Sequence, residues 1–393
     1  MIRKISAHYI FPADAPPLKR GIISINEHGE IIDLTDTGGM LPEISNLEFY
    51  DGIITPGFIN THTHLELSNL KGTIHQRKGL IHFLKLVGEQ HDIETSGAFM
   101  QKADTEMLHN GIVAAGDISN TNLSFPIKAK SKIKYFTFIE VLGIKDSIAI
   151  ERFPHGVNLW QQLESLSLPG SITPHAPYSI SDMLWKMIVD FSKTHNLTWS
   201  VHNQENINEN QLFLNKTGEF VEFLNGFSEE FSNWQPKGVS SLNFCRQYYE
   251  HIAKVLLVHN TFTSAEDLEL ISPLKEKITL VLCPNSNLYI EGRLPNINLL
   301  RNAGFRIALG TDSLASNTTL SILEEMKTIQ NHFPQISIQE LIDWGTINGA
   351  TALGFHNQLG SLKKGMKPGL NLINNIDFKE MQLTPQSEVK VIF

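Results

Sequence analysis

Apolar runs that end abruptly in polar or ionisable residues recur along the middle of the chain, each followed by a stretch long enough for a helix. Continuous apolar runs of this kind are typical of strands that are buried on both faces of a parallel sheet. The runs cover residues 57–62, 112–117, 135–140, 171–175, 198–202, 255–259, 278–283 and 306–312. Eight strands alternating with helices predict an α/β fold, a (β/α)8 TIM-type barrel, in which the chemistry lies at the carboxyl ends of the strands.

The two ends of the chain have a different pattern. Residues 1 to about 55 and those from about 356 onward carry short β-type runs separated by Asn, Gly and Pro, which is typical of small antiparallel sheets. We therefore expect a small composite β-sandwich domain built from residues 1–55 and 356–393, and a catalytic barrel over residues 56–355. The segment from about 206 to 250 is longer than one crossover needs, so it is a candidate lid or substrate loop.

Composition narrows the classes of protein and partner. The 393 residues are 41 % hydrophobic and 19 % charged, which predicts a large folded core. Acidic residues outnumber basic ones, 41 to 32, and no dense Lys or Arg block is present, so nucleic acid is not an expected partner. We see no signal-peptide pattern and no apolar run long enough for a membrane helix, and Cys245 and Cys283 fit reduced thiols. A cytoplasmic protein without a membrane partner is therefore expected.

Two histidines at the end of the first predicted strand have a spacing that suits a metal site. His62 and His64 lie two residues apart, so on an extended strand both imidazoles point to the same side. In a chain with 16 histidines, this pair alone is weak evidence. However, His202, His259 and Asp312 end other predicted strands. Because chance rarely places such residues at several strand ends of one barrel, we predict that they converge on a metal ion.

Ordered motifs along nearly the whole chain resemble those of the amidohydrolase superfamily, in particular its branch of mononuclear aminohydrolases. The motifs cover residues 56–64, 174–179, 202–205, 258–260, 283–287 and 309–313. The resemblance implies a barrel enzyme that hydrolyses carbon–nitrogen bonds other than peptide bonds. Its substrates would be cyclic amidines such as cytosine, guanine, adenosine-type nucleosides or triazines.

The same resemblance implies a set of metal ligands. They are His62, His64, His202 and Asp312, with His259 hydrogen-bonded to metal-bound water or to substrate. Imidazole nitrogens with one carboxylate suit Zn²⁺, and Fe²⁺ would also be tolerated. Binuclear members of the superfamily bridge their metals with a carboxylated lysine at the end of the fourth strand, whereas here that strand ends at His175. We therefore expect one divalent metal ion per chain.

Glu205 follows His202 by three residues and resembles the proton shuttle of the family. In the reaction that this implies, Asp312 and His259 orient and help deprotonate the attacking water, Glu205 protonates the adjacent ring nitrogen, and ammonia leaves. A loop salt bridge is the structural alternative for Glu205. The unrelated zinc-type pyrimidine deaminases need a Pro-Cys-x-x-Cys pair, which is absent, because Cys283 has no second cysteine nearby.

Three residues are candidates for substrate contact, each with an alternative. Glu66 could accept hydrogen bonds from ribose hydroxyls or orient a histidine. His175 resembles the substrate-contacting histidine of the family, and its alternative is a core hydrogen bond. Arg293 could meet a ring carbonyl or carboxylate, or be an exposed loop charge. Two other strand ends, Asp117 and Glu140, fit pocket lining and structural hydrogen bonding equally well.

The leading interpretation is a metal-dependent hydrolytic deaminase of a purine nucleoside-like compound, such as 6-aminodeoxyfutalosine or a nucleoside of the S-adenosylhomocysteine or methylthioadenosine type. Residues 62–68, with 78–80, are similar to deaminases of 6-aminodeoxyfutalosine. Two alternatives stay open: hydrolysis of a ring amide or carbon–halogen bond in a nitrogen heterocycle, and a non-catalytic binding or scaffold homologue. The intact ligand set argues against the second. A small-molecule substrate is the expected partner, and a homodimer is a candidate assembly.

Overall fold

Eight parallel strands form the centre of the molecule in the computed structural model, which describes residues 2–89, 97–227 and 229–393. They are arranged as two four-stranded sheets in which neighbouring strands pair in parallel. The first sheet contains β6 (Phe58–Thr63), β7 (Ile112–Ser119), β8 (Lys134–Val141) and β9 (Gly170–Pro174), and the second contains β10 (Thr198–Asn203), β11 (Lys254–His259), β12 (Ile278–Leu282) and β13 (Arg306–Leu309).

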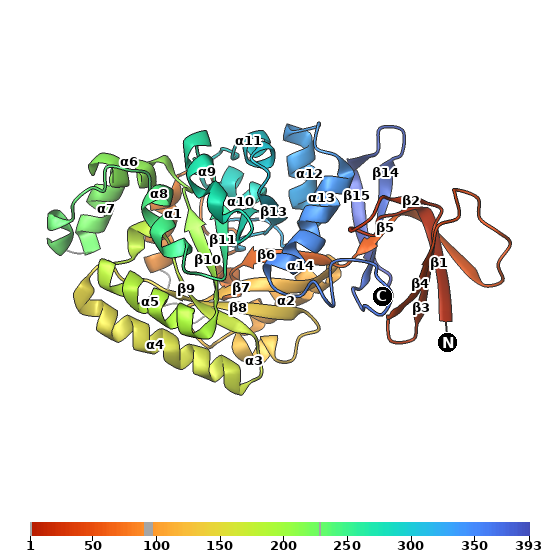
Figure 1. The fold of residues 1–393 in the computed structure, drawn as a ribbon, viewed down its shortest axis with the longest axis horizontal. Helices are drawn as coiled ribbons and strands as arrows, with labels where there is room; N and C mark the ends of the chain where they lie inside the picture. Colours follow the sequence, from red (N-terminus) through yellow and green to blue (C-terminus); the bar gives the residue numbers. More distant parts are fainter. Residues whose placement is uncertain (1, 90–96, 228) are drawn as a thin grey trace.

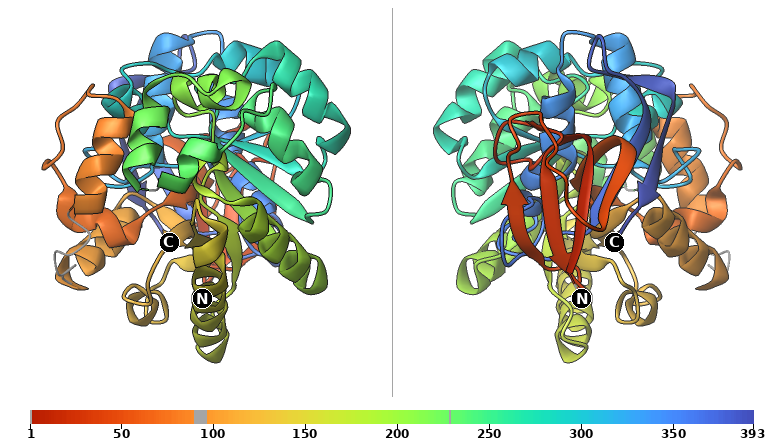
Figure 2. Two further views of the ribbon diagram at one scale, coloured as in Figure 1. Left: turned by 90° about the vertical axis from the view of Figure 1, so that its left-hand side faces the viewer. Right: turned by 90° about the vertical axis from the view of Figure 1, so that its right-hand side faces the viewer.

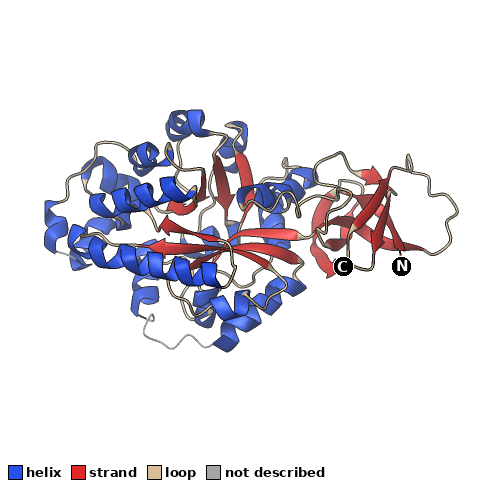
Figure 3. Cartoon of the chain, turned by 60° about the horizontal axis from the view of Figure 1, so that its bottom comes forward, coloured by secondary structure: helices blue, strands red, loops and turns tan. Residues whose placement is uncertain are grey.

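Backbone hydrogen bonds join the two sheets at both seams. At one seam the N–H of His202 donates to the carbonyl of His175 at 2.9 Å. At the other, the N–H groups of Thr311 and Asp312 donate to the carbonyl of His62 at 3.1 and 3.0 Å. The strands therefore follow in chain order around a ring. Helices lie around them on the outside (Figures 1 and 3). The predicted α/β barrel is therefore confirmed.

Helices cover the outer face of the barrel. α4 (Asp146–Ser165) lies against β8 and β9, and α5 (Asp182–His195) lies against β9. α5 begins after Ser181, whose hydroxyl accepts the N–H of Leu184, and it ends where Asn196 adopts a left-handed φ of 53°. Its apolar face, including Trp185 and Ile188, is buried in the main core. The remaining helices around the strands are η1 (Leu65–Leu70), α2 (Gly97–His109), α3 (Phe125–Lys128), η2 (Pro177–Ser179), α9 (Ala265–Ile271), η4 (Ser272–Leu274), α10 (Pro284–Ile290), α11 (Ile297–Asn302), α12 (Ile322–His332), α13 (Ile338–Gly345) and α14 (Ile347–Ala352).

The two ends of the chain meet in one seven-stranded sheet beside the barrel (Figure 1, right). Its order is β15-β14-β5-β1-β3-β4, and β2 pairs with β1. The strands are β1 (Ile2–Ile10), β2 (Leu18–Lys19), β3 (Ile22–Asn26), β4 (Ile31–Thr35), β5 (Leu47–Pro56), β14 (Leu370–Asp377) and β15 (Gln382–Val391). Antiparallel pairing of β14 with β5 is the link between the two ends, although β1 and β5 pair in parallel. The division into domains at residues 55 and 356 stays a prediction.

A helical cap covers the opposite end of the barrel (Figure 2, left). It consists of α1 (Leu80–Glu89), α6 (Ile207–Asn215), α7 (Glu219–Phe227), η3 (Glu229–Asn233) and α8 (Ser241–Tyr249), so the segment 206–250 is mostly helical. A second apolar cluster holds the cap together: Phe83 of α1 and Phe220 of α7 are buried in it beside Tyr178. Because α6 follows the carboxyl end of β10, the cap stands at the end of the barrel where chemistry is expected.

Within the described ranges, no helix combines the length and the apolar content that crossing a bilayer requires. The cytoplasmic location and the homodimer stay predictions.

Candidate active site

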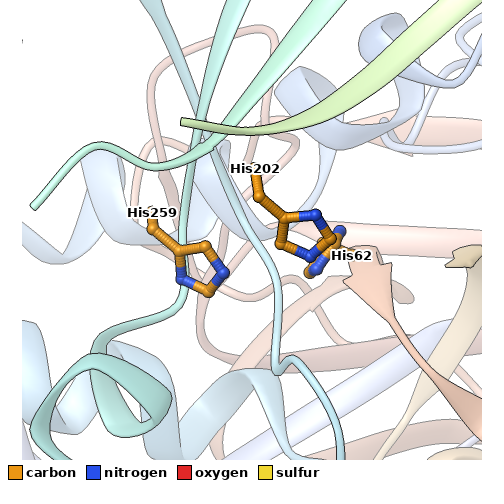
Figure 4. Close-up of side chains that lie close together, drawn as sticks. All are labelled: His62, His202 and His259. Atoms are coloured by element: carbon orange, nitrogen blue, oxygen red, sulfur yellow. The ribbon is translucent and has the colours of Figure 1, made fainter. Parts of the chain in front are cut away.

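Histidines from three strands converge at the carboxyl end of the barrel (Figure 4). His62 lies on β6, His202 on β10 and His259 on β11, and their ring centroids lie 5.0 Å (His62 to His202) and 5.8 Å (His62 to His259) apart. His64, just after β6, brings its Nε2 to 3.1 Å from the Nε2 of His62. Asp312, which follows β13, places Oδ1 at 3.4 Å from Nε2 of His64 and 3.7 Å from Nε2 of His62. The structure thus brings together residues that are up to 250 positions apart in the chain.

The backbone at these strand ends adopts conformations that side chains usually avoid. His259 has a φ of 74° and Asp312 a φ of 55°, both in the left-handed region. Such positions cost of order 1–3 kcal/mol and are common at functional sites. Just before Asp312, a side chain at Gly310 would come within 2.8 Å of Cβ of His62. Glycine at this position is therefore required for β13 to approach β6 closely enough to bring Asp312 to the histidines.

Hydrogen bonds fix the orientation of several of these side chains. Both Ser286 and Ser316 donate hydroxyl hydrogen bonds of 2.6 Å to Oδ2 of Asp312. This leaves Oδ1 of Asp312 directed at the histidines. Nδ1 of His202 lies 3.0 Å from the carbonyl of His175, so its Nε2 is free to face the cluster. Such supporting contacts orient ligands in metal sites.

Burial sets the protonation of the cluster. Desolvation lowers the pKa of His64 and of His259 to about 3, and it lowers the pKa of His62 well below its ordinary value. These imidazoles are neutral near pH 7, which leaves a lone pair for a metal. Burial favours the neutral form of Asp312, but the nearby histidines and the two serine hydroxyls outweigh it and lower the pKa of this carboxyl. Neutral imidazoles, each with a nitrogen lone pair, beside an ionised carboxylate form a donor set that fits a divalent cation.

Two groups of ligand atoms in this cluster are close enough to share an ion. His62, His64 and Asp312 form one, and His62, His202 and His259 form the other; within each, the ligand atoms lie within 4.8 Å of one another. The residues predicted as metal ligands therefore lie together, and His259 lies among them. Their assignment as ligands stays a prediction that this geometry supports.

Glu205 lies beside the cluster, two residues after the end of β10. Its Oε2 is 3.7 Å from Nε2 of His259, and only 4 % of the residue is exposed. Burial, followed by repulsion from Asp312, raises the pKa of Glu205 well above its ordinary value. A tight turn at Gln204 (φ 45°) places it there, and the carbonyl of Gln204 accepts the N–H of Phe262 at 2.9 Å. A buried carboxyl with a raised pKa holds a proton more readily than an exposed one, which suits a proton donor at this position.

A cavity of about 440 Å³ opens over the cluster, within the range of small-molecule sites. Its polar lining is His64, Glu66, Asn69, Asn120, Thr121, Glu140, His175, His202, Glu205, His259, Asp312 and Ser313. The rest of its lining is largely apolar and comes mainly from η1 and α1. None of the described residues of the segment 206–250 lines the cavity. That segment instead supports the wall, because the ring of Phe220 packs 4.3 Å from that of Tyr178, which does line it.

The three predicted substrate residues differ in their placement. Glu66 lines the cavity, and its carboxylate accepts the N–H of Asn120 at 3.0 Å and the hydroxyl of Thr121 at 2.8 Å. These partners follow β7, so the carboxylate is held by a loop and not by a histidine. Burial raises the pKa of Glu66 to about 7. His175 also lines the cavity, with Nδ1 at 2.8 Å from Oγ of Ser179.

Arg293 lies elsewhere. It is an exposed residue, it is not among the residues that line the cavity, and its guanidinium stacks over the ring of Phe262 at 4.7 Å. The structure therefore does not bring Arg293 to the cluster, and a substrate contact by this residue has no geometric support.

Ser316 had no clear signal in the sequence, because nothing in its neighbourhood marks it as a partner of Asp312. Glu140 lines the cavity with Oε1 at 3.5 Å from Nδ1 of His202, and its Oε2 also accepts a hydrogen bond from Nδ2 of Asn120 at 3.1 Å, so both of its predicted alternatives are present. Asp117, in contrast, is fully buried in an ion pair with Lys128 at 2.5 Å. Lys128 is one of several lysines in a polar stretch, and only the fold shows that it points inward.

A parallel barrel with a cluster of histidines and an aspartate at its mouth is the architecture of a barrel enzyme with a candidate metal site. The family model described as amidohydrolase family matches residues 53–391. The chain belongs to the amidohydrolase family, whose members are metal-dependent hydrolases. The resemblance seen in the motifs is thereby confirmed.

Proteins with related sequences and structures are named as deaminases. The chain is 26 % identical over 353 residues to an adenosine deaminase of Helicobacter pylori, covering 86 % of this chain and 83 % of the relative. It is 26 % identical over 337 residues to an aminodeoxyfutalosine deaminase of Nitratiruptor sp., covering 82 % and 79 %. A crystal structure of Helicobacter pylori aminofutalosine deaminase in complex with methylthio-coformycin superposes with a TM-score of 0.82 at 24 % identity, covering 97 % of this chain and 94 % of that one. This last likeness concerns the fold.

Proposed function

We propose that this protein is a metal-dependent aminohydrolase that replaces the amino group of an adenine nucleoside by hydrolysis and releases ammonia. One observation carries the proposal: the histidine and aspartate cluster and the buried carboxyl of Glu205 lie together at one cavity of nucleoside size. The names of the relatives support the substrate class, since each is a deaminase of an adenine nucleoside or a close derivative.

The metal is assigned to His62, His64, His202 and Asp312, and Zn²⁺ suits this set best. When bound, such an ion supplies Lewis-acid chemistry that lowers the pKa of a water molecule. The requirement of one ion per chain agrees with the end of β9, where His175 and not a lysine follows the strand.

The side chains around the cluster would handle the protons and the substrate. Glu205 would hold the proton that a ring nitrogen takes up during attack at the adjacent carbon. Asp312 and His259 would accept the proton of the attacking water and pass one to the departing amine. His175 would orient the base, and Glu66, with lone pairs not used by Asn120 and Thr121, would accept ribose hydroxyls.

Release of ammonia from adenosine and related nucleosides by the zinc-loaded protein tests this proposal. Glu205→Gln keeps the shape of the side chain and removes the transferable proton, so kcat should fall by about 10²–10⁴. Glu222→Gln is the matched control, because Glu222 is an exposed residue of α7, and it should retain wild-type rates. Equal rates for Glu205→Gln and Glu222→Gln would refute the role of Glu205. Ring opening or halide release, without ammonia from any nucleoside, would instead favour a hydrolase of ring amides or carbon–halogen bonds.

A further inference from the structure

Glu291 directly follows α10 and connects two segments at the mouth of the cavity. Its Oε1 accepts the backbone N–H of Leu80 and the side-chain Nδ2 of Asn206, each at 2.8 Å. Leu80 is the first residue of α1, and Asn206 directly follows Glu205. One carboxylate oxygen therefore joins a helix that lines the cavity to the turn that carries the proposed proton donor. Glu291 itself is not among the residues that line the cavity.

The first of these segments, α1, is fixed at its start by the end of α10. The first N–H groups of a helix have no partner within the helix, and a carboxylate at this end also interacts favourably with the helix dipole. In the loop before α1, the N–H of Gly79 donates to the carbonyl of Ile290 at 3.1 Å. The N–H of Arg77 likewise donates to the carbonyl of Tyr289 at 2.6 Å. The position of α1 sets that of its four cavity-lining side chains, Leu80, Phe83, Leu84 and Val87.

The second segment, the turn at Glu205, is held through Asn206. The side chain of Asn206 is buried and uses both of its ends: Oδ1 accepts the N–H of Asn208 at 2.7 Å and caps α6, while Nδ2 donates to Glu291. Because both ends have partners, this side chain is held in one orientation. On the other side of Glu205, the carbonyl of Gln204 accepts a backbone N–H from the loop after β11 at 2.9 Å. The backbone of Glu205 therefore lies between two anchors, one of which depends on Glu291.

We propose that Glu291 is a positioning residue for deamination, which couples the placement of α1 over the substrate to the placement of the Glu205 carboxyl. This rests on the proposed function. Hydrogen bonds that end on a carboxylate are shorter and stronger than those between neutral groups, so this half-buried side chain holds both segments at once. Catalysis is sensitive to such placement, because a shift of about 1 Å costs up to about 10²-fold in rate. Loss of Glu291 therefore affects both the binding of the substrate and the transfer of the proton.

Three variants separate the two contacts of Glu291 from general effects on the fold. Glu291→Ala removes the shared acceptor. Glu291→Gln keeps an oxygen at Oε1 and therefore retains both contacts. Asn206→Ser retains an oxygen that caps α6, since serine is a good N-cap residue, but its side chain is too short to reach Glu291. Glu276→Ala is the matched control, because Glu276 is an exposed glutamate before β12, at the opposite end of the barrel.

Deamination of adenosine by the whole zinc-loaded protein gives the first test. We expect Glu291→Ala to lower kcat by about tenfold or more and to raise KM by about threefold or more. Glu291→Gln should stay within about threefold of the wild type in both constants, and Glu276→Ala should match the wild type. Because Glu291→Ala and Asn206→Ser remove the same hydrogen bond, their effects on kcat should not multiply, and the double variant should be about as slow as Glu291→Ala alone. A loss confined to one constant, an equal loss in Glu291→Gln, or multiplying effects in the double variant would overturn the proposal.

Hydrogen exchange, followed by mass spectrometry on the protein without substrate, gives the second test. Since Glu291 holds both segments, Glu291→Ala should increase the exchange rates of residues 79–86 and 203–210 together, by about fivefold or more. Neither segment should change in Glu291→Gln or in Glu276→Ala. Faster exchange in only one segment, or in neither, would show that Glu291 does not couple them.

Failure of the two claims can be told apart. If the wild type releases no ammonia from any adenine nucleoside, the proposed function is refuted, and the role of Glu291 in it falls as well. If the wild type deaminates adenosine and Glu291→Ala behaves like Glu276→Ala, only the positioning role is refuted.

Discussion

The buried ion pair between Lys128 and Asp117 allows a sharp prediction about stability. Both side chains are fully buried, and Nζ of Lys128 lies 2.5 Å from Oδ2 of Asp117. The other two donors of the ammonium group reach the hydroxyls of Ser119 and Thr137 at 2.8 and 3.1 Å. Oδ1 of Asp117 accepts the N–H of Leu65 at 2.8 Å, directly after the histidine pair. All three lysine donors are thus used, and the pair ties α3 to the start of η1.

Lys128→Met removes the ammonium group and keeps most of the apolar stem. It leaves the carboxylate of Asp117 buried without its counter-charge, and breaking a buried pair in this way costs about 3–5 kcal/mol. Burial already raises the pKa of Asp117, and Lys128 is the largest influence that opposes this. Without the lysine, the carboxylate of Asp117 must take up a proton or the barrel must open. We therefore expect the free energy of unfolding to fall by about 3–5 kcal/mol.

The double variant Lys128→Met with Asp117→Asn removes both charges. Because the two residues are in contact, their effects should not add, and the double variant should be more stable than the sum of the single effects by about 1–3 kcal/mol. Lys186→Met is the control, because Lys186 is exposed on α5, and it should change stability by less than about 0.5 kcal/mol.

Urea unfolding, followed by circular dichroism and tryptophan fluorescence, measures the free energy of unfolding of the wild type, of both single variants Lys128→Met and Asp117→Asn, of the double variant and of the control Lys186→Met. The reasoning is refuted if Lys128→Met loses less than about 1 kcal/mol, a value within the range of exposed pairs. It is also refuted if the double variant equals the sum of the two single variants, since the pair would then make no coupled contribution.

Three further predictions concern the site and its surroundings. Ser316→Ala removes a 2.6 Å hydrogen bond to Asp312, so the affinity for the metal should fall about 10- to 100-fold. Competition with a chromophoric chelator measures this affinity, and an unchanged value would show that the hydroxyl is not needed. Glu325 has a pKa raised to about 8, mainly by burial. A carboxyl with a raised pKa contributes its full stability below pH 4.5, and this contribution is lost as pH rises through 8. The free energy of unfolding in urea should therefore fall between pH 5 and 8 by at most about 3–5 kcal/mol. Glu325→Gln should flatten this slope, and an equal slope in the variant would contradict the assignment. Phe220→Ala removes a buried ring that supports Tyr178 at 4.3 Å, so KM should rise more than kcat falls; a loss confined to kcat would contradict a supporting role.

The barrel was predictable from the sequence because its strands are buried on both faces. The run at residues 255–259 corresponds to β11 (Lys254–His259), and the run at 57–62 to β6 (Phe58–Thr63). The run at 306–312 is longer than β13 (Arg306–Leu309), because its last residues turn away from the strand to bring Asp312 to the histidines. Apolar continuity therefore located the strands, but it did not mark where the backbone leaves them.

Convergence of the candidate ligand residues was also predictable, since in a parallel barrel the carboxyl ends of all strands meet at one mouth. Contacts between distant loops were not predictable from the sequence. Nothing local in the sequence distinguishes Ser316, which contacts Asp312, from other serines, and Lys128 resembles its exposed neighbours. Arg293 shows the reverse case. Its position after a strand suggested a role in the cavity, but stacking on Phe262 holds it outside.

The central claim is that the chain is a metal-dependent aminohydrolase of an adenine nucleoside. The most direct test is the amount of ammonia released per nucleoside consumed by the zinc-loaded protein, before and after removal of the metal by a chelator. We expect one ammonia released per nucleoside consumed, loss of turnover on chelation and recovery when Zn²⁺ is restored. Consumption of nucleoside without ammonia, or turnover that persists in the metal-free protein, would contradict the claim.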